Sequence, residues 1–149
     1  STTALIADYL RITDVTFVTN GLEHARVLAH AGYRVVMLGG EIKPMTEAVV
    51  GSSVIDTLRR FNFTKGFFGT NGISIKSGFT TPEVNEAAVK TEAMHHCRSR
   101  YVLADSGKFD TIATLTFAPL SDACIITTES ERNLSGYAEQ TTIIEVKRL

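Results

Sequence analysis

The sequence predicts an α/β fold with a doubly wound, mostly parallel sheet flanked by helices. Strand-like and helix-like patterns alternate along the chain, and the strand-like runs are apolar at nearly every position. Such alternation builds parallel sheets through helical crossovers, and continuous apolar strands are typical of sheets covered on both faces. No repeat, linker or low-complexity segment interrupts the pattern, so residues 1–149 are predicted to form one domain.

Each predicted strand is a short run rich in β-branched or aromatic residues. The predicted strands are residues 15–19, 34–38, 65–69, 100–104, 123–127 and 142–146, with a shorter one at 115–117. Helices are predicted where apolar residues recur at helical spacing, or where proline and acidic residues open a segment. The predicted helices are residues 3–10, 22–31, 52–60 and 82–97. Residues 41–47 are interpreted as a polar connection and residues 70–83 as mostly loop, because glycine and proline interrupt the latter.

Composition excludes several functional classes. Hydrophobic residues make up 44% and charged residues 21%, which is typical of a soluble globular protein. The net charge of -1 leaves no basic footprint for nucleic acid, so any DNA binding would lie outside this segment. No apolar run approaches the ~18 residues of a membrane span, and a reducing cytosol is the simplest compartment. The two cysteines, Cys97 and Cys124, are interpreted as buried thiols. The histidines show no metal-ligand spacing, so no metal is expected. Gly39-Gly40 lacks the G-x-G-x-x-G pattern of a dinucleotide site, and no cofactor is expected.

The chain begins with Ser1-Thr2-Thr3, directly before a helical stripe. Hydroxyl groups and free backbone N–H groups at a helix start form either an ordinary helix cap or an anion site. A native domain rarely starts at such a point. We therefore expect an N-terminal truncation that removed an upstream strand and part of a phosphate loop.

Small, turn-forming or charged residues follow four of the predicted strands. They are Asn20 after the first strand, Gly39 and Gly40 after the second, Asn71 and Gly72 after the third, and Asp105 and Lys108 after the fourth. Ordinary turn chemistry explains any one of them. Because ligands of open parallel sheets bind outside the carboxyl ends of the strands, their coincidence at one edge predicts a ligand cleft.

Two charged pairs stand out near this predicted edge. Asp105 and Lys108 share a tight turn, where a carboxylate can accept bonds from sugar hydroxyls and an ammonium can neutralise a phosphate. The alternative is a surface ion pair of small energetic effect. Glu86 and Lys90 lie four apart on the helix predicted at 82–97, which is also the ordinary spacing of a helix-supporting pair. Both alternatives stay open at this point.

Taken together, these motifs resemble the C-terminal effector domain of DeoR-family (GlpR-type) bacterial transcription regulators. The matching pieces are Ser1-Thr2-Thr3, Thr19-Asn20, Leu38-Gly39-Gly40, Gly51, residues 67–73, residues 78–80, Glu86-Ala87-Ala88-Val89-Lys90, residues 105–109 and Ile125-Ile126-Thr127. The similarity spans nearly the whole chain. Two departures are Gly107, where the family has a second serine, and Thr128, where it commonly has aspartate.

The resemblance implies a fold similar to ribose-5-phosphate isomerase and glucosamine-6-phosphate deaminase. It also implies a sensor that binds a phosphorylated sugar or sugar metabolite and alters DNA binding by a separate, missing N-terminal helix-turn-helix domain. A homo-oligomer without membrane attachment is expected. The phosphate would lie on Ser1, Thr2 and Thr3, assisted by Lys108 or Lys90. The sugar end would be lined by Asn20, Gly40, Asn71, Asp105 and Glu86.

Two other functions are weighed against the sensor. One is a sugar-phosphate isomerase or deaminase of the same fold, in which Glu86 or Asp105 would act as the general base. The other is a structural dimerisation module, which would leave the polar strand ends without a role. The chain lacks the glycine-rich lysine motif of the isomerases. We therefore expect a sensor without catalytic residues.

Overall fold

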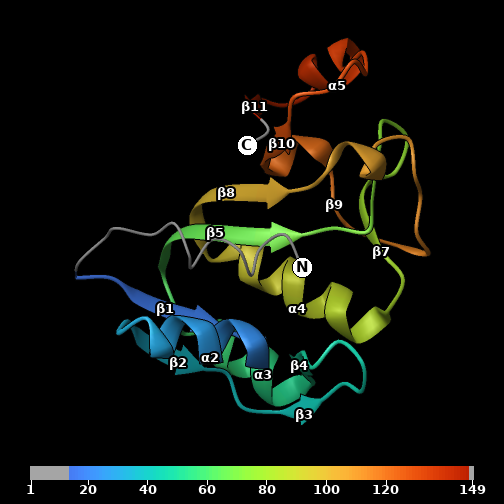
Figure 1. The fold of residues 1–149 in the computed structure, drawn as a ribbon. Coiled ribbons are helices and arrows are strands. Elements are labelled where there is room, and N and C mark those ends of the chain that lie inside the picture. The colour runs from blue at the N-terminus through green and yellow to red at the C-terminus, as the bar shows by residue number, and fades with distance from the viewer. Residues whose placement is uncertain (1–13, 148–149) are drawn as a thin grey trace. The chain divides into compact units, whose positions relative to one another are not determined.

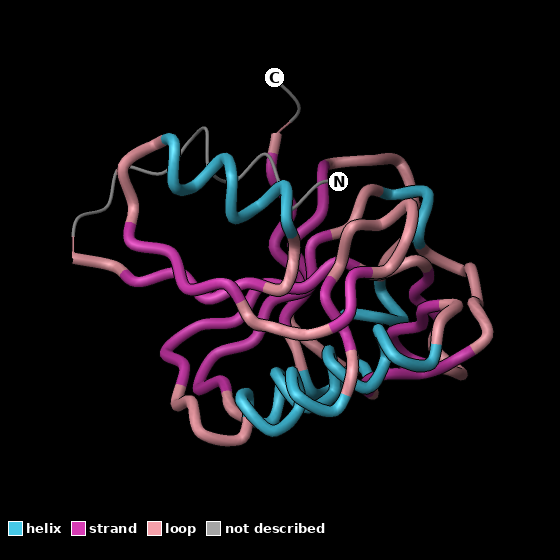
Figure 2. The backbone as a smooth tube through the Cα atoms, turned by 90° about the horizontal axis from the view of Figure 1, so that it is seen from below, coloured by secondary structure: helices cyan, strands magenta, loops and turns pink. Residues whose placement is uncertain are grey.

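The computed structural model describes residues 14–147, which form two compact units that adjoin in sequence at Phe61 and Asn62 (Figure 1). The fold class predicted from the sequence is confirmed: the protein is α/β, and its four-stranded sheet is parallel and flanked by helices. Ser1, Thr2, Thr3 and the helix predicted at 3–10 lie outside the described residues. Figure 2 follows the alternation of helix and strand along the backbone.

The first unit contains one βαβ motif and one hairpin. Strands β1 (Thr16–Thr19) and β2 (Arg34–Met37) pair in parallel, with Thr19 opposite Met37, and α2 (Leu22–His30) connects them. Strands β3 (Glu41–Ile42) and β4 (Val49–Val50) form the antiparallel hairpin, and α3 (Ser52–Leu58) follows. Val54 and Leu58 are buried on α3, so this short helix is held by its apolar face.

The second unit contains the four-stranded parallel sheet, in the order β11-β10-β8-β5. Its strands are β5 (Phe63–Gly69), β8 (Cys97–Leu103), β10 (Cys124–Thr128) and β11 (Ile143–Val146). Helix α4 (Val84–His95) lies between β5 and β8 in sequence, and α5 (Ser135–Ala138) lies between β10 and β11. Strand order therefore follows chain order, as successive crossovers in one direction require.

A smaller antiparallel sheet packs in the same unit. Its strands are β6 (Gly72–Ser74), β7 (Gly78–Thr81) and β9 (Leu115–Ala118), in the order β6-β7-β9. Ile73, Phe79 and Phe117 of this sheet share one core with Val102 and Ile125 of the parallel sheet. The core thus connects the two sheets of the second unit and fixes the loops at their junction.

The structure corrects two connections predicted from the sequence. Residues 70–83 were predicted to be mostly loop but contain β6 and β7, and residues 41–47 contain β3 and the tip of the β3–β4 hairpin. Both errors have the same cause: these strands have only two to four residues, too few to show an alternating pattern. Gly78, with φ at 71°, supplies the left-handed turn residue of the second hairpin rather than a break in structure.

Candidate functional site

The carboxyl ends of β5 and β8 lie side by side in the second unit. Gly69, the last residue of β5, is the register partner of Leu103, the last residue of β8. Asn71 and Asp105 each follow two residues later, so the structure brings the ends of these two predicted segments to one sheet edge. The backbone N–H of Ala104 donates to the carbonyl oxygen of Ile126 at 3.0 Å, which places the end of β10 at the same edge.

Lys90 extends from α4 to this edge. Its Nζ donates a hydrogen bond to the carbonyl oxygen of Gly69 at 2.8 Å and lies 5.0 Å from the centroid of the Phe117 ring. Burial lowers the pKa of Lys90 to about 8, and the nearby charge of Glu86 opposes this shift. The site therefore holds a cation whose own hydration is poor, directly beside a strand end where an anionic ligand could bind.

Glu86 lies one helical turn before Lys90 and is half-buried. Among the described side chains, no nitrogen–oxygen contact within 4.0 Å joins Glu86 to Lys90, so the helix-supporting ion pair is not formed. The N-terminus of α4 is instead closed by Glu83, whose carboxylate accepts from the backbone N–H groups of Asn85 at 3.1 Å and Glu86 at 2.8 Å. An anion at the start of α4 would meet this carboxylate, so Lys90 is the better candidate contact.

Asp105 and Lys108 lie in a 3-10 turn at Ser106–Lys108. The Oδ1 atom of Asp105 accepts from the backbone N–H of Gly107 at 2.9 Å, and the backbone N–H of Lys108 donates to the Asp105 carbonyl at 3.1 Å. Within the described chain, the Lys108 ammonium has no hydrogen bond or ion pair, and the surface ion pair with Asp105 is absent. One carboxylate oxygen and one ammonium group of this turn are thus available to a ligand.

Asn71 and Gly72 begin the β6–β7 hairpin beside this turn. The Asn71 Oδ1 atom accepts from the Thr81 hydroxyl at 3.1 Å, while its backbone N–H donates to Thr80. A Cβ atom on Gly72 would overlap the carbonyl oxygen of Thr111. Gly72 is therefore a close-packing residue, and the side chain of Asn71 is partly committed to the hairpin.

The predicted residues of the first unit lie at the carboxyl ends of β1 and β2. The Asn20 amide donates to the Val49 carbonyl at 3.0 Å, and the Val49 N–H donates back to the Asn20 carbonyl at 2.7 Å. A Cβ atom on Gly40 would lie 2.7 Å from the Val50 carbonyl oxygen, whereas one on Gly39 would meet no described atom within 4 Å. Asn20 and Gly40 thus hold the β3–β4 hairpin, and ligand contacts by Asn20, Gly39 and Gly40 stay predictions.

Four residues near the second-unit edge have no role that the sequence predicted. They are Thr127, Asp110, Arg132 and Tyr137. The Thr127 hydroxyl is buried near the end of β10 and has no hydrogen-bond partner within residues 14–147. The only sequence signal for it is a polar residue closing an apolar strand. The other three form a hydrogen-bonded cluster that no local pattern indicates, because its members are up to 27 residues apart.

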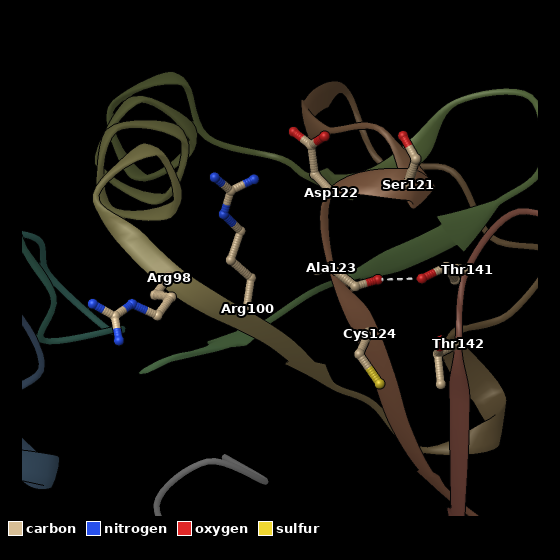
Figure 3. Close-up of a pocket in the computed structure, with 8 residues that line it drawn as sticks. All are labelled: Arg98, Arg100, Ser121, Asp122, Ala123, Cys124, Thr141 and Thr142. Carbon is tan, nitrogen blue, oxygen red and sulfur yellow. Dashed lines mark hydrogen bonds between the residues drawn. The ribbon is translucent and has the colours of Figure 1, made fainter. Parts of the chain in front are cut away.

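A hollow of about 410 Å³ lies at the opposite, amino edge of the parallel sheet (Figure 3). It is lined by Arg98 and Arg100 of β8, together with Asp122, Cys124 and neighbouring residues. Figure 3 shows the two guanidinium groups pointing in different directions, so they do not converge on one anion. None of the predicted site residues lines this hollow. Between residues 14 and 147, no group of three or more His, Cys, Asp or Glu side chains is placed to hold a metal ion.

A match to a family model shows which protein family the chain belongs to. A family model described as the DeoR C terminal sensor domain matches residues 1–130. The chain belongs to this family. This match confirms the resemblance to the DeoR family that the sequence motifs indicated. Several of those motifs are the polar strand ends of this DeoR-type domain.

Several curated proteins are similar to this DeoR-type domain. An uncharacterized HTH-type transcriptional regulator FruR of Bacillus subtilis is 38% identical over 149 residues, which cover 99% of this chain and 59% of the relative. A lactose phosphotransferase system repressor of Staphylococcus epidermidis is 29% identical, covering 93% of this chain and 58% of the relative. Its counterpart in Staphylococcus aureus is 28% identical, covering 88% and 53%. The chain thus spans somewhat more than half the length of these relatives. No helix in residues 14–147 is long and apolar enough to cross a membrane.

Proposed function

We propose that this chain is the effector-sensing part of a cytoplasmic transcription regulator of sugar metabolism, and that it binds a phosphorylated sugar or sugar metabolite. The ligand would bind at the carboxyl edge of the parallel sheet in the second unit. Binding there would change the DNA affinity of a helix-turn-helix domain elsewhere in the full-length protein. The family supports sensing, and the names of the relatives support transcription regulation.

The observation that carries this proposal is the placement of Lys90. Burial lowers its pKa to about 8, yet its Nζ remains at the strand end, bound to the Gly69 carbonyl. A phosphate beside this ammonium would replace the hydration that burial removes. Lys108 supplies a second ammonium that has no partner among the described residues. Asp105 and Glu86 supply carboxylates that can accept bonds from sugar hydroxyls.

The proposed role is sensing without catalysis. An isomerase would need a general base free to reach a substrate carbon. One oxygen of the Asp105 carboxylate is bound to Gly107 in the turn at 2.9 Å, so only its other oxygen could serve as such a base. The relatives described above carry regulator and repressor names, which favours a sensor. Coupling between ligand and DNA requires different ligand affinities in two states of the regulator.

The test is ligand binding by the full-length gene product. We would titrate ribose 5-phosphate, glucosamine 6-phosphate and the monophosphates of glucose, fructose and galactose, each beside its free sugar and beside inorganic phosphate. A sugar phosphate at a hundred times its Kd should stabilise the protein by about 2.7 kcal/mol. Absence of any thermal shift or heat of binding across the panel would overturn the proposal.

A lysine pair separates phosphate contact from general effects of charge. Lys108→Ala should weaken a sugar phosphate more than the matching free sugar, because only the phosphate interacts with the ammonium. The matched control is Lys76→Ala at an exposed position between β6 and β7, which should leave both affinities unchanged. Equal losses for phosphate and free sugar in the Lys108 variant would remove Lys108 from the phosphate contact.

A further inference from the structure

Among the described residues, the hydrogen bonds of the turn that carries Asp105 and Lys108 come from residues nearby in the chain, including the Thr111 hydroxyl, which donates to the Gly107 carbonyl at 3.5 Å. The internal hydrogen bonds of the turn run from Gly107 to Asp105 at 2.9 Å and from Lys108 to Asp105 at 3.1 Å. The turn is tied to the rest of the unit just beyond its end, where buried Phe109 forms an isolated parallel bridge with Ile73 of β6. The position of the site groups therefore depends on how firmly this junction is held.

Asp110, directly after the junction, has φ at 60°. This left-handed conformation is uncommon outside glycine and persists only when surrounding contacts maintain it. The Asp110 carboxylate provides such contacts in two directions. Its Oδ2 atom accepts from Nη1 of Arg132 at 2.9 Å, and its Oδ1 atom accepts from the Tyr137 hydroxyl at 2.7 Å.

Tyr137 holds both sides of the junction with one hydroxyl group. The hydroxyl donates to the Asp110 carboxylate, and the Ile73 carbonyl oxygen lies 3.1 Å away as an alternative acceptor. The hydroxyl oxygen also accepts from the Asp110 backbone N–H at 3.1 Å. The Tyr137 ring packs edge-on against Phe109 with centroids 4.9 Å apart, and only 3% of the residue is exposed. A single buried side chain thus binds β6 and the residues that follow the turn.

We propose that Tyr137 is a positioning residue of the effector site. Its hydroxyl fixes Asp110 against β6 and so sets where Asp105 and Lys108 present their carboxylate and ammonium groups. Tyr137 is buried under the turn and acts through Asp110 without touching the ligand. The inference rests on the proposed function, because the placement of the turn affects binding only if the turn belongs to the ligand site.

The test compares Tyr137→Phe with Tyr101→Phe in the full-length gene product. Tyr101 lies in β8, stacks on Phe67 with centroids 5.3 Å apart, and its hydroxyl makes no hydrogen bond within the described chain, so this variant removes an equivalent atom away from the turn. The sugar phosphate that binds the parent protein most tightly in the panel above is the probe. Its Kd is measured by calorimetry well below the unfolding temperature of each variant.

Tyr137→Phe should weaken the probe about tenfold, the lower end of what loss of an orienting partner costs at other sites. Tyr101→Phe should change the Kd by less than about twofold. A merely structural role predicts a different result: a lower Tm for Tyr137→Phe with an unchanged Kd at low temperature, which would overturn the inference. If the parent protein binds no sugar phosphate, the proposed function fails first, and the two failures are thereby distinguished.

A second variant keeps the test decisive should Tyr137→Phe not fold. Asp110→Gly removes the carboxylate at an exposed position while keeping a residue that adopts positive φ readily. Its backbone N–H can still donate to Tyr137, so the fold should persist while the turn loses its carboxylate anchor. A folded Asp110→Gly variant with a several-fold weaker Kd supports the inference, and an unchanged Kd contradicts it.

Discussion

Replacing Lys90 by methionine removes a buried ammonium group and keeps an unbranched side chain of similar reach. In the folded chain, burial lowers the pKa of Lys90 from 10.5 to about 8, and Glu86 opposes the shift. The unfolded chain lacks this burial, so it binds more protons than the folded chain between about pH 8 and 10.5. The free energy of unfolding of the parent protein should therefore rise with pH across this window, relative to that of Lys90→Met.

The size of the effect follows from the shift in pKa. At about 1.4 kcal/mol per pKa unit, a fall from 10.5 to about 8 corresponds to roughly 3 kcal/mol of destabilisation by the charged lysine. This penalty is fully present below the folded pKa and disappears as pH rises past the unfolded pKa. The methionine variant also loses the hydrogen bond to Gly69, which costs about 1–3 kcal/mol at every pH. That loss displaces the variant's stability curve without changing its dependence on pH.

The assay is urea unfolding of both proteins at pH 7, 8, 9 and 10. From pH 7 to 10, the stability of the parent should improve relative to Lys90→Met by about 2.5 kcal/mol. Lys76→Met, at an exposed position, reports the contribution of a lysine outside the core. If the difference in free energy of unfolding between the parent and Lys90→Met stayed constant with pH, the pKa of Lys90 would not be lowered by burial, and the reasoning would be refuted. A bound sugar phosphate should raise the pKa of Lys90, so affinity should fall as pH rises through about 8.

Three further predictions concern single contacts. Gly40→Ala should lower the free energy of unfolding by roughly 1–3 kcal/mol, because the new Cβ would lie 2.7 Å from the Val50 carbonyl oxygen. The control Gly39→Ala, whose new Cβ meets no described atom within 4 Å, should match the parent protein in urea unfolding. Thr127→Val should stabilise the fold by about 1 kcal/mol, because it removes a buried hydroxyl that has no partner in the described part of the chain. A destabilised variant in the same urea assay would contradict this. Asp105→Ala should lower the free energy of unfolding by about 0.5–1 kcal/mol in thermal unfolding, because it removes the acceptor for the Gly107 N–H. Asp105→Asn keeps an acceptor oxygen and should retain most of this stability. Equal losses in the two variants would show that the hydrogen bond to Gly107 does not stabilise the turn.

The parallel βα units could be predicted from the sequence because their signals are local. An apolar run followed by a breaker located β1, β2, β5 and β10 closely. Strand β8 begins earlier than predicted, at Cys97, because its first residues pair with Phe63 and Lys65 of β5. Such pairing joins segments more than thirty residues apart and leaves no trace in the composition of either one. The short helix α5 was likewise not predicted, since four residues carry no helical period.

The location of the candidate site could also be predicted, whereas the availability of its groups could not. Parallel strands necessarily end at one edge, so the residues after β5 and β8 had to meet. Whether a polar group there is free depends on its partners, which come from distant segments. The Asn20 amide binds Val49 and the Asn71 carboxamide oxygen binds Thr81, while the Lys108 ammonium binds no described residue. From their spacing along the chain, these residues are equally good candidates for ligand contacts. Only the folded structure shows which side chains already have partners.

The burial of Lys90 is itself an argument for ligand binding at this edge. A penalty of roughly 3 kcal/mol is a large fraction of the ~5–15 kcal/mol that stabilises an ordinary domain. A methionine would fill the same space against Phe117 without it. A buried ammonium that lowers stability and would be stabilised by a nearby anion matches the trade between stability and function seen at binding sites. Apart from the hydrogen bond to Gly69, stability gives no reason for a lysine at this position, whereas recognition of a phosphate does.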